Sequence, residues 1–381
     1  MNILMNALPA LSGGAVSYSR NLTPLLAEQF GRSQAVHRLT VLAHESQKPL
    51  FEGLPDEMFH WIGGERPMGW RRLLWERRNI KAIASETRAD ALFTPYQVGP
   101  KVSGIRQVLM IRNMEPFLHR TYPYSVAMRL RNEALARASA RGLRGADRVI
   151  AVSNFARAQL EDGLSIPSNR IRTIYHGRAE ALELAQPTEA ASQTLAQIGV
   201  MGPFLLTCGS LLPYRRCEDV IAAFDRLAVD LPDNMQLVIA GSGSDRRYRE
   251  LIHQAIDASA NRDRIRAVGH VPSETMAALY HHCRVCIIAT EIEACPNIAI
   301  EAMTAGCVIV ASDKPPLPEI FDDASVIYRA RDVEDLAAAI GRALRDETLR
   351  QEMPGLARRR AKRFSWRACA DKTYQALTDW P

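Results

Sequence analysis

The chain has 381 residues, which is too long for one compact core and suits two domains of roughly 150–200 residues each. Its 47% hydrophobic and 24% charged residues exclude a disordered chain, a collagen-like chain and a coiled-coil rod. The formal charge is +6, but residues 1–180 hold 25 Lys and Arg against 15 Asp and Glu, a balance of +10. This basic half favours an anionic partner, either nucleic acid or an anionic membrane surface.

Targeting signals and cysteines point to one compartment. No apolar run approaches the roughly 20 residues that span a bilayer, so we expect no membrane-spanning helix. Pro9 and Gly13-Gly14 interrupt any apolar core of a signal peptide, so we expect no signal peptide either. The 7 cysteines are odd in number and all follow residue 200, which predicts reduced thiols in a cytoplasmic protein. Cys283 and Cys286 form one C-x-x-C beside His281 and His282, but no second pair stands at a zinc spacing, so no metal site is predicted.

Strand-like and helix-like stretches alternate along the first half. The predicted strands are 2–8, 37–43, 91–94, 107–112, 148–152 and 170–175. The predicted helices are 15–29, 69–86, 125–144 and 154–163. The stretch 179–199 has no clear strand character, although part of it has helical composition, and it marks the region of a domain boundary.

The second half restarts the same alternation. The predicted strands are 204–208, 236–240, 264–268, 285–289, 308–311 and 325–328, and the predicted helices are 218–228, 245–258, 273–281, 297–304 and 333–345. The C-terminal 35 residues are predicted to be helices that Phe364-Ser365-Trp366 interrupts. Alternation of this kind predicts an α/β protein with two Rossmann-like domains, 1–185 and 200–363, that face a central cleft. We also expect the last segment, 364–381, to be a helix that returns toward the first domain.

Two acidic residues flank a predicted helix start after the strand 285–289. Glu293 lies in the loop and Glu301 about one turn into the helix. A helix N-terminus presents free N–H groups that suit a diphosphate, and carboxylates on either side accept hydrogen bonds from the hydroxyls of a sugar and a ribose. The alternative is that Glu291 and Glu293 solvate a loop and Glu301 lies on an exposed helical face. The spacing does not decide between them.

Three further segments follow strands at positions suited to anions. Arg215-Arg216 follows the strand that ends near Gly209, where cationic side chains meet an anionic ligand or form a solvated basic pair. Gly241-Ser-Gly243 ends another strand, but Arg246 replaces the third glycine of a dinucleotide fingerprint. Gly13-Gly14 links the first strand to the first helix, either for close approach of a ligand or for a tight turn.

Taken in order, these motifs resemble the retaining nucleotide-sugar glycosyltransferases of family four, which have the GT-B fold. The matching motifs are Gly13-Gly14, Gly-Ser-x-x-Pro-x-Arg at 209–215, Ala-Gly-x-Gly at 240–243, Gly-His-Val at 269–271 and Glu-seven-Glu-Ala-Met-x-x-Gly from Glu293. Further matches are 150–155, 174–177, 317–319 and 363–366. The resemblance covers essentially the whole chain and is most specific over 290–312.

The resemblance implies roles for individual residues. It implies that Glu293 binds donor-sugar hydroxyls and Glu301 the ribose hydroxyls. The implied diphosphate ligands are Arg215, which matches a phosphate-binding Lys, the backbone N–H groups around Asn297 and Ile298, and the loop of Gly13 and Gly14. His270 and Val271 match the loop that meets the base, and Ser210 and Gly241 match the remaining donor-binding loops.

Three departures from the family pattern matter. Ser210 stands where the family often has Arg, which makes Arg216 a candidate second cation. Pro296 in the loop before the helix donates no N–H. Arg112 aligns with an active-site His, so Arg112 joins Glu293 and Arg215 as a candidate catalytic residue. Asn113 and Glu115 are candidates for contacts with donor sugar or acceptor.

The implied activity is retaining transfer of a hexose-type sugar from a nucleoside diphosphate sugar to a glycan or lipid-linked acceptor, in surface polysaccharide or glycolipid synthesis. The chain has no Asp-x-Asp, so we expect metal-independent transfer and no cofactor beyond the donor substrate. A GT-B nucleotide-sugar epimerase and a non-catalytic nucleotide-binding scaffold remain alternatives. No nucleic-acid-binding signature is present, and the incomplete glycine fingerprint disfavours a dehydrogenase.

Two basic stretches in the first half favour an anionic membrane surface. They contain Arg71, Arg72, Arg77, Arg78 and Lys81 in one and Arg129, Arg131, Arg137, Arg141, Arg144 and Arg148 in the other. We expect peripheral association with the inner face of the membrane, where each basic residue near the surface contributes on the order of 1 kcal/mol. Solvated faces on ordinary helices are the alternative.

Overall fold

The computed structural model describes residues 1–11, 13–32, 37–122, 124–184, 189–243 and 245–380. The chain divides into two compact units. Unit 1 consists of Met1–His119, Ser125–Gly177 and Ser365–Pro381, and unit 2 of Arg120–Tyr124 and Arg178–Phe364.

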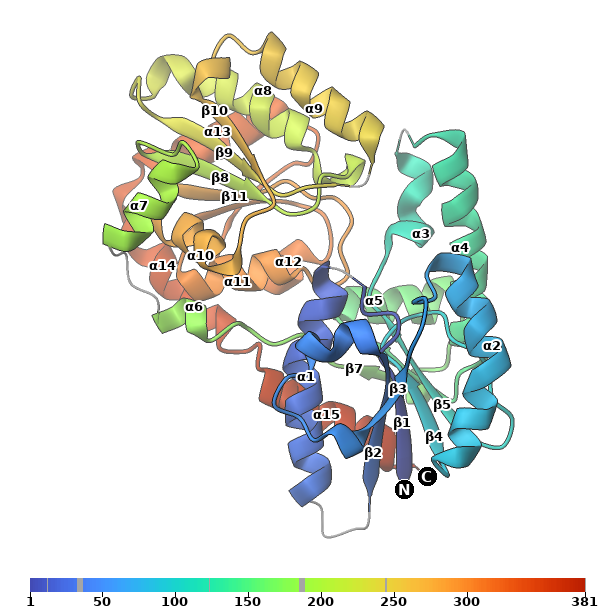
Figure 1. Cartoon of the computed structure of the whole chain (residues 1–381). Coiled ribbons are helices and arrows are strands. Elements are labelled where there is room, and N and C mark those ends of the chain that lie inside the picture. The colour runs from blue at the N-terminus through green and yellow to red at the C-terminus, as the bar shows by residue number, and fades with distance from the viewer. Residues whose placement is uncertain (12, 33–36, 123, 185–188, 244, 381) are drawn as a thin grey trace. The chain divides into compact units, whose positions relative to one another are not determined.

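Unit 1 is built on a parallel sheet with the strand order β3-β2-β1-β4-β5-β6-β7. Its strands are β1 (Asn2–Asn6), β2 (Arg38–His44), β3 (Phe59–Ile62), β4 (Ala91–Thr94), β5 (Arg106–Ile111), β6 (Arg148–Ala151) and β7 (Ile171–Thr173). Its helices are α1 (Gly13–Arg32), α2 (Gly69–Glu86), α3 (Glu115–Leu118), α4 (Val126–Gly145), α5 (Asn154–Ala158) and α15 (Trp366–Thr378). Figure 1 shows α1 on one side of this sheet and α2 and α4 on the other.

Unit 2 is built on a second parallel sheet, in the order β10-β9-β8-β11-β12-β13. Its strands are β8 (Phe204–Cys208), β9 (Gln236–Ala240), β10 (Ile265–Gly269), β11 (Val285–Ile288), β12 (Ile309–Ser312) and β13 (Val326–Tyr328). Its helices are α6 (Ala181–Leu184), α7 (Glu189–Gln197), α8 (Cys217–Leu227), α9 (Arg246–Ala258), α10 (Ser273–His282), α11 (Asn297–Ala305), α12 (Leu317–Phe321), α13 (Val333–Arg345) and α14 (Glu347–Ala361).

The local sequence explains these elements. The central strands are aliphatic and buried along their whole length, as expected for parallel strands covered on both faces. Side chains of Ser125, Asp245 and Asp332 accept hydrogen bonds from the first turns of α4, α9 and α13, and so fix where these helices begin.

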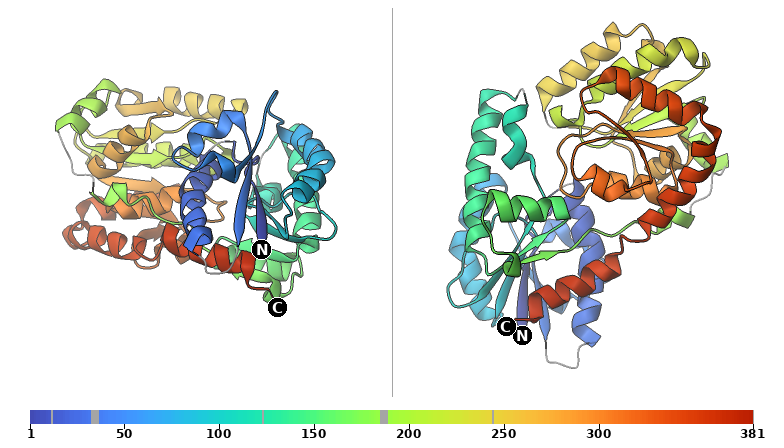
Figure 2. Two further views of the ribbon diagram at one scale, coloured as in Figure 1. Left: turned by 60° about the horizontal axis from the view of Figure 1, so that its bottom comes forward. Right: turned by 180° about the vertical axis from the view of Figure 1, so that it is seen from behind.

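The end of the chain packs within unit 1, where two sequence motifs meet. Helix α15 lies beside α1 (Figure 2). The imidazole of His176 stacks on the indole of Trp366 at a centroid separation of 5.9 Å. A Cβ at Gly177 would lie 2.2 Å from the backbone nitrogen of Trp366, so only glycine permits this approach.

The predicted α/β class is confirmed, and strands β4, β8 and β9 and helices α2 and α13 have the predicted bounds. Strand β3 was not predicted. It has four half-buried residues at the sheet edge, and Phe59 and Trp61 stack on each other at 4.4 Å. Such a short edge strand lacks the aliphatic run that marks a buried one.

Candidate donor-binding site

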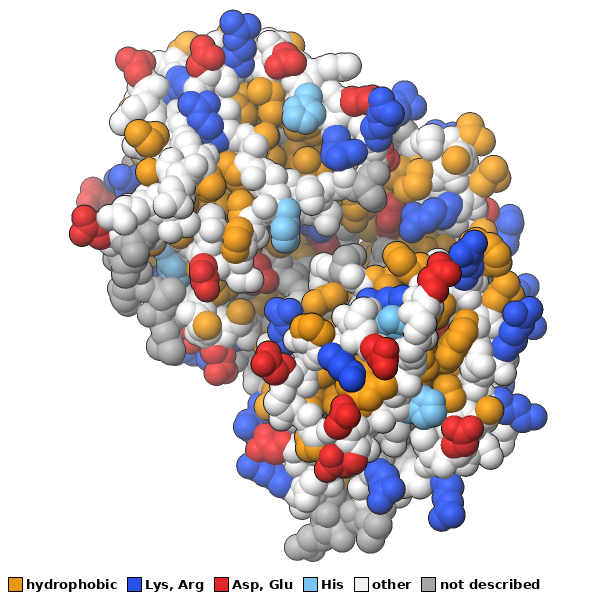
Figure 3. All heavy atoms as spheres, viewed as in Figure 1, with side chains coloured by type: hydrophobic (Ala, Val, Ile, Leu, Met, Phe, Trp, Pro, Cys, Tyr) orange, Lys and Arg blue, Asp and Glu red, His pale blue; other side chains and the backbone are white. Residues whose placement is uncertain are grey.

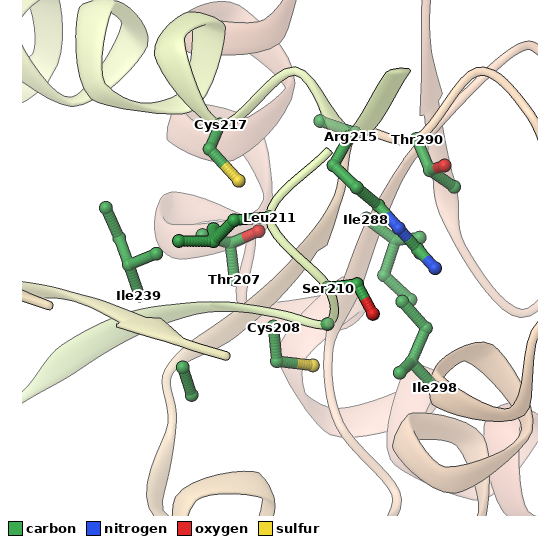
Figure 4. A pocket seen from close by; sticks show the side chains of 13 residues that line it. Thr207, Cys208, Ser210, Leu211, Arg215, Cys217, Ile239, Ile288, Thr290 and Ile298 are labelled. Carbon is green, nitrogen blue, oxygen red and sulfur yellow. The ribbon is translucent and has the colours of Figure 1, made fainter. Parts of the chain in front are cut away.

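A hollow lies at the carboxyl ends of β8 and β11 in unit 2 (Figure 4). Its lining includes Gly209 and Ser210 after β8, Arg215 from the following turn, Thr290 after β11 and Ile298 in α11. Loops at the carboxyl ends of parallel strands are where open α/β sheets bind ligands. The structure therefore brings together three residues that were predicted separately, Ser210, Arg215 and Ile298.

The guanidinium of Arg215 points into this hollow and forms an ion pair with Glu293. The two side chains are only 15% and 12% exposed. Burial raises the pKa of the Glu293 carboxyl, although Arg215 and the hydroxyl of Thr290 lower it in part. The contact lacks hydrogen-bond geometry, and Nε of Arg215 and Oε1 of Glu293 are buried with no hydrogen bond within the described residues. Both groups keep donors and acceptors that a ligand would satisfy.

Helix α11 starts beside the same hollow. Pro296 is its N-cap residue, and no side chain caps the helix within the described part of the chain. The N–H groups of Ala299 and Ile300 bond to the carbonyl of Pro296, at 3.1 and 3.4 Å. The first turn at Asn297 and Ile298 thus lies at the positive end of the helix dipole, a site that favours a phosphate.

Glu301 lies one turn into α11, and its position depends on Tyr280 of α10. The Tyr280 hydroxyl donates to Oε2 of Glu301 at 3.0 Å and lies 3.3 Å from Sγ of Cys208. Burial raises the pKa of Glu301, which this hydrogen bond lowers only in part. Tyr280 was not predicted, because nothing in its local sequence distinguishes it from an ordinary core tyrosine.

The glycines after β9 serve the packing of the site. Gly241 has φ +145°, and a Cβ there would lie 1.8 Å from the carbonyl oxygen of Gly209. A Cβ at Gly243 would lie 2.0 Å from the carbonyl oxygen of Leu211. The glycines let the loop after β9 pack directly against the loop after β8, which carries Ser210.

Glu291 belongs to a separate network. Arg331 binds its carboxylate in bidentate fashion, with both contacts at 2.8 Å, and the Tyr122 hydroxyl donates to Oε2 at 2.5 Å. Although burial raises the pKa of Glu291, these hydrogen bonds outweigh it and hold the pKa low. The alternative in which Glu291 and Glu293 solvate an exposed loop is therefore wrong, since both side chains are buried.

Arg216 is engaged away from the donor hollow. It makes a bidentate contact with Asp219 at 2.9 and 2.8 Å and an ion pair with Glu218 at 2.8 Å. Arg216 has a left-handed backbone conformation, φ +53°, and directly precedes α8. As a candidate second cation for the diphosphate, Arg216 would have to give up these carboxylates. His270 is exposed and Val271 half-buried in the loop after β10, beyond the residues that line the hollow.

The remaining predicted residues lie in unit 1. Gly13 and Gly14 begin α1. The guanidinium of Arg112 lies over the ring of Tyr18, 5.1 Å from its centroid. Gln97 fixes the next residue, since its amide accepts from the N–H of Asn113 and donates to the carbonyl of Asn113, at 3.1 and 2.9 Å.

Glu115 begins α3 in the same loop and is buried. Its N–H bonds to the side chain of Asn113 at 2.9 Å. Its carboxylate accepts from Asn132 at 3.4 Å. The loop after β5 is thus held in one conformation by side-chain hydrogen bonds.

Comparison with known proteins agrees with this fold. Solved structures of the GT-B class cover the chain from end to end. HepE of Anabaena in complex with UDP-glucose has a TM-score of 0.77 at 16% identity, and WaaG, a glycosyltransferase involved in lipopolysaccharide biosynthesis, has 0.72 at 15%, each covering 100% of both chains. The protein has the GT-B fold.

Family models divide the chain between them. Residues 12–179 match the Glycosyltransferase Family 4 model and residues 196–360 match Glycosyl transferases group 1. This chain therefore belongs to the family-four type of glycosyltransferase.

Among curated relatives, O-antigen chain mannosyltransferase B of Escherichia coli is 26% identical over 241 residues, which are 60% of this chain and 59% of the relative. Serotype-specific mannosyltransferase WbdA of Escherichia coli is 22% identical over 234 residues, 61% of this chain and 29% of the relative. The chain thus spans less than two thirds of these relatives.

Proposed function

We propose that this protein transfers a hexose-type sugar from a nucleoside diphosphate sugar to a glycan or lipid-linked acceptor, with retention of configuration. The observation that carries this proposal is that Arg215 and the first turn of α11, at Ile298, line one hollow, and that Arg215 is paired with Glu293. The Arg215 cation and the N-terminus of α11 suit the diphosphate, and the carboxylates of Glu293 and Glu301 suit the sugar and ribose hydroxyls.

The proposed chemistry follows from where charge develops. The bond between the anomeric carbon and the diphosphate oxygen breaks, and the diphosphate gains negative charge beside Arg215 and α11. The acceptor hydroxyl attacks the same face of the sugar, and its proton passes to the departing diphosphate oxygen. No metal ion and no cofactor is assigned a role in this step, since Arg215 and backbone N–H groups stabilise the leaving group.

The names of the similar proteins favour polysaccharide or glycolipid synthesis. Two of the curated relatives are mannosyltransferases, and one is an O-antigen chain enzyme. HepE has been crystallised with UDP-glucose. UDP-linked hexoses are therefore among the first donors to test.

A binding panel followed by product analysis tests the proposal. Thermal shifts are measured with GDP-, UDP-, ADP- and dTDP-sugars, because a ligand that binds the native state raises the unfolding temperature. We expect one base to be preferred and its sugar to appear in a glycoside with an added acceptor. An epimerised nucleotide sugar without transfer would favour an epimerase, and binding without turnover on any acceptor a scaffold.

We also propose that unit 1 binds an anionic membrane surface. Helix α2 exposes Trp70 (68%) and Leu74, Met68 directly precedes it, and α4 exposes Val126 (74%) and Leu130 (67%). Basic and apolar side chains stand together over α2 and α4 in Figure 3. Apolar side chains that insert and cations that contact headgroups are the composition of an interfacial helix. No helix in the described ranges has the length and hydropathy to cross a bilayer.

The structure corrects two of the residues predicted for this surface. Arg72 is buried and bonds to Glu76 at 2.8 Å. Arg148 is buried and donates to the carbonyls of Ala376 and Asp379, at 2.7 and 2.8 Å. Both are structural and cannot contact lipid headgroups.

Flotation with liposomes tests the membrane proposal. We expect binding to vesicles with anionic lipid at low salt and loss of binding at high salt, where the charges are screened. The double variant Trp70→Ala/Leu130→Ala should bind more weakly. Met201→Ala/Val229→Ala, which changes exposed residues of unit 2, is the matched control. Absence of binding at low salt would leave a soluble acceptor as the better interpretation.

A further inference from the structure

Two cysteines that are distant in the sequence meet behind the donor site. Cys283 follows the last turn of α10, and Cys307 follows the end of α11. Their Sγ atoms are 3.9 Å apart, and both are free thiols. Both sulfurs lie close to the carbonyl oxygen of Tyr280, at 3.3 and 3.2 Å. Cys283 of the C-x-x-C segment is thus next to Cys307, and Cys286 of the same segment also contacts Cys307.

The pair is placed for a disulfide. A disulfide bond is about 2.05 Å long, so its formation requires the two sulfurs, now 3.9 Å apart, to approach by about 2 Å. Each cysteine lies at a helix end, where its N–H bonds to the last turn: Cys283 to the carbonyl of Leu279 at 3.1 Å and Cys307 to the carbonyl of Ala302 at 3.0 Å. Among the described residues no group of three or more Cys, His, Asp or Glu side chains is arranged to hold a metal ion.

Exposure sets the order of reaction. Cys283 is half-buried, whereas Cys307 is only 4% exposed. The hydrogen bond with Cys307 lowers the pKa of the Cys283 thiol, although burial leaves that pKa above its ordinary value. The same hydrogen bond raises the pKa of Cys307. Since Cys283 is the more exposed of the two residues, it is the one that attacks an external disulfide, and Cys307 resolves the product.

Tyr280 connects this pair to the donor site. Its carbonyl oxygen lies against both thiols, and its hydroxyl holds Glu301 at 3.0 Å. A disulfide has no S–H to donate, so oxidation leaves this carbonyl without a thiol donor. It also draws together the ends of α10 and α11, the helices that carry Tyr280 and Glu301.

We propose that Cys283 and Cys307 form a reversible dithiol–disulfide couple, and that its oxidation weakens donor binding through Tyr280. The oxidant is a small-molecule disulfide such as glutathione disulfide. The Cys283 thiolate attacks one sulfur and releases one glutathione thiolate. The Cys307 thiolate then attacks Sγ of Cys283 and releases the second. The protein loses two electrons and two protons, and one glutathione disulfide becomes two glutathione thiols.

Mass spectrometry of the full-length protein tests the first half. After incubation with glutathione disulfide, we expect the intact mass to fall by two hydrogen atoms, one peptide pair to link Cys283 with Cys307, and dithiothreitol to reverse the change. Cys307→Ser should stop at a glutathione adduct on Cys283, and Cys283→Ser should form no such link. Cys369→Ser, which removes the single cysteine of unit 1, should behave like the wild type. Absence of the link, or another pairing, overturns the proposal.

The claim that oxidation weakens donor binding rests on the proposed function, and it is tested by titrating GDP and UDP against the reduced and the oxidised protein. We expect oxidation to weaken nucleotide binding about tenfold, equivalent to about 1.4 kcal/mol. After the same treatment with glutathione disulfide, Cys307→Ser should lose no more nucleotide affinity than its glutathione adduct on Cys283 causes. Equal affinity of both forms would refute the coupling through Tyr280. If the reduced protein binds neither nucleotide, the proposed function fails, while the mass measurement still reports on the couple.

Discussion

Replacing Glu301 by Gln should stabilise the protein while it removes activity. Glu301 is a carboxylate near the start of α11 that accepts a hydrogen bond from a neutral hydroxyl, that of Tyr280, and burial raises its pKa. Gln keeps the size and an acceptor for Tyr280 but removes the buried charge. The gain should be about 1 kcal/mol, inside the range of about 0.5–2 kcal/mol for single stabilising substitutions. For domains of about 150–250 residues this corresponds to about 2–4 °C.

The pH dependence separates this reasoning from a general packing effect. Because the pKa of Glu301 is higher in the folded than in the unfolded chain, the folded state holds this proton more tightly, and wild-type stability falls as pH rises from the unfolded pKa through the folded one. The Gln variant lacks this loss. The difference in unfolding temperature, measured by calorimetry, should therefore be small at pH 5 and larger at pH 8. A variant less stable than wild type at pH 8, or a difference independent of pH, would refute the reasoning.

Three other outcomes follow from the same site. Arg215→Ala and Glu293→Gln should each lower kcat/KM for transfer by about 10²–10³, whereas Arg226→Ala, an exposed arginine of the same unit, should not. Gly241→Ala should cost roughly 1–3 kcal/mol in denaturant unfolding because its Cβ overlaps the carbonyl of Gly209, whereas Gly31→Ala, with nothing within 4 Å, should cost nothing. Transfer should persist in EDTA, and loss that magnesium or manganese restores would show a metal requirement.

The features that could be predicted from the sequence are those that depend on hydrophobic periodicity and on the order of strands and helices. Long aliphatic strands and amphipathic helices gave accurate bounds for β8, β9, α2 and α13, because parallel strands buried on both faces leave a continuous signal. The partners of charged side chains were not predictable, since they come from distant parts of the chain. Arg148 stands in a basic stretch that predicts an exposed cation, but its guanidinium is buried and donates to backbone carbonyls near the C-terminus. The sequence around Tyr280 is that of an ordinary core aromatic residue, and only the fold shows that its hydroxyl donates to Glu301 of α11.

The three carboxylates of the segment that precedes and begins α11 show why spacing alone left their roles open. Glu291 meets Arg331 in a bidentate contact and accepts from Tyr122, so its hydrogen-bonding capacity is used within unit 2. Glu293 touches Arg215 without hydrogen-bond geometry, which leaves both groups able to bind something else. Glu301 has a neutral partner. Burial costs a carboxylate free energy that hydrogen bonds and opposite charge offset, and only Glu291 has both in full. Glu293, paired with Arg215 of the hollow, and Glu301 in α11 are the two carboxylates with unmet hydrogen-bonding capacity, and the hydroxyl groups of a bound ligand would relieve their remaining cost of burial.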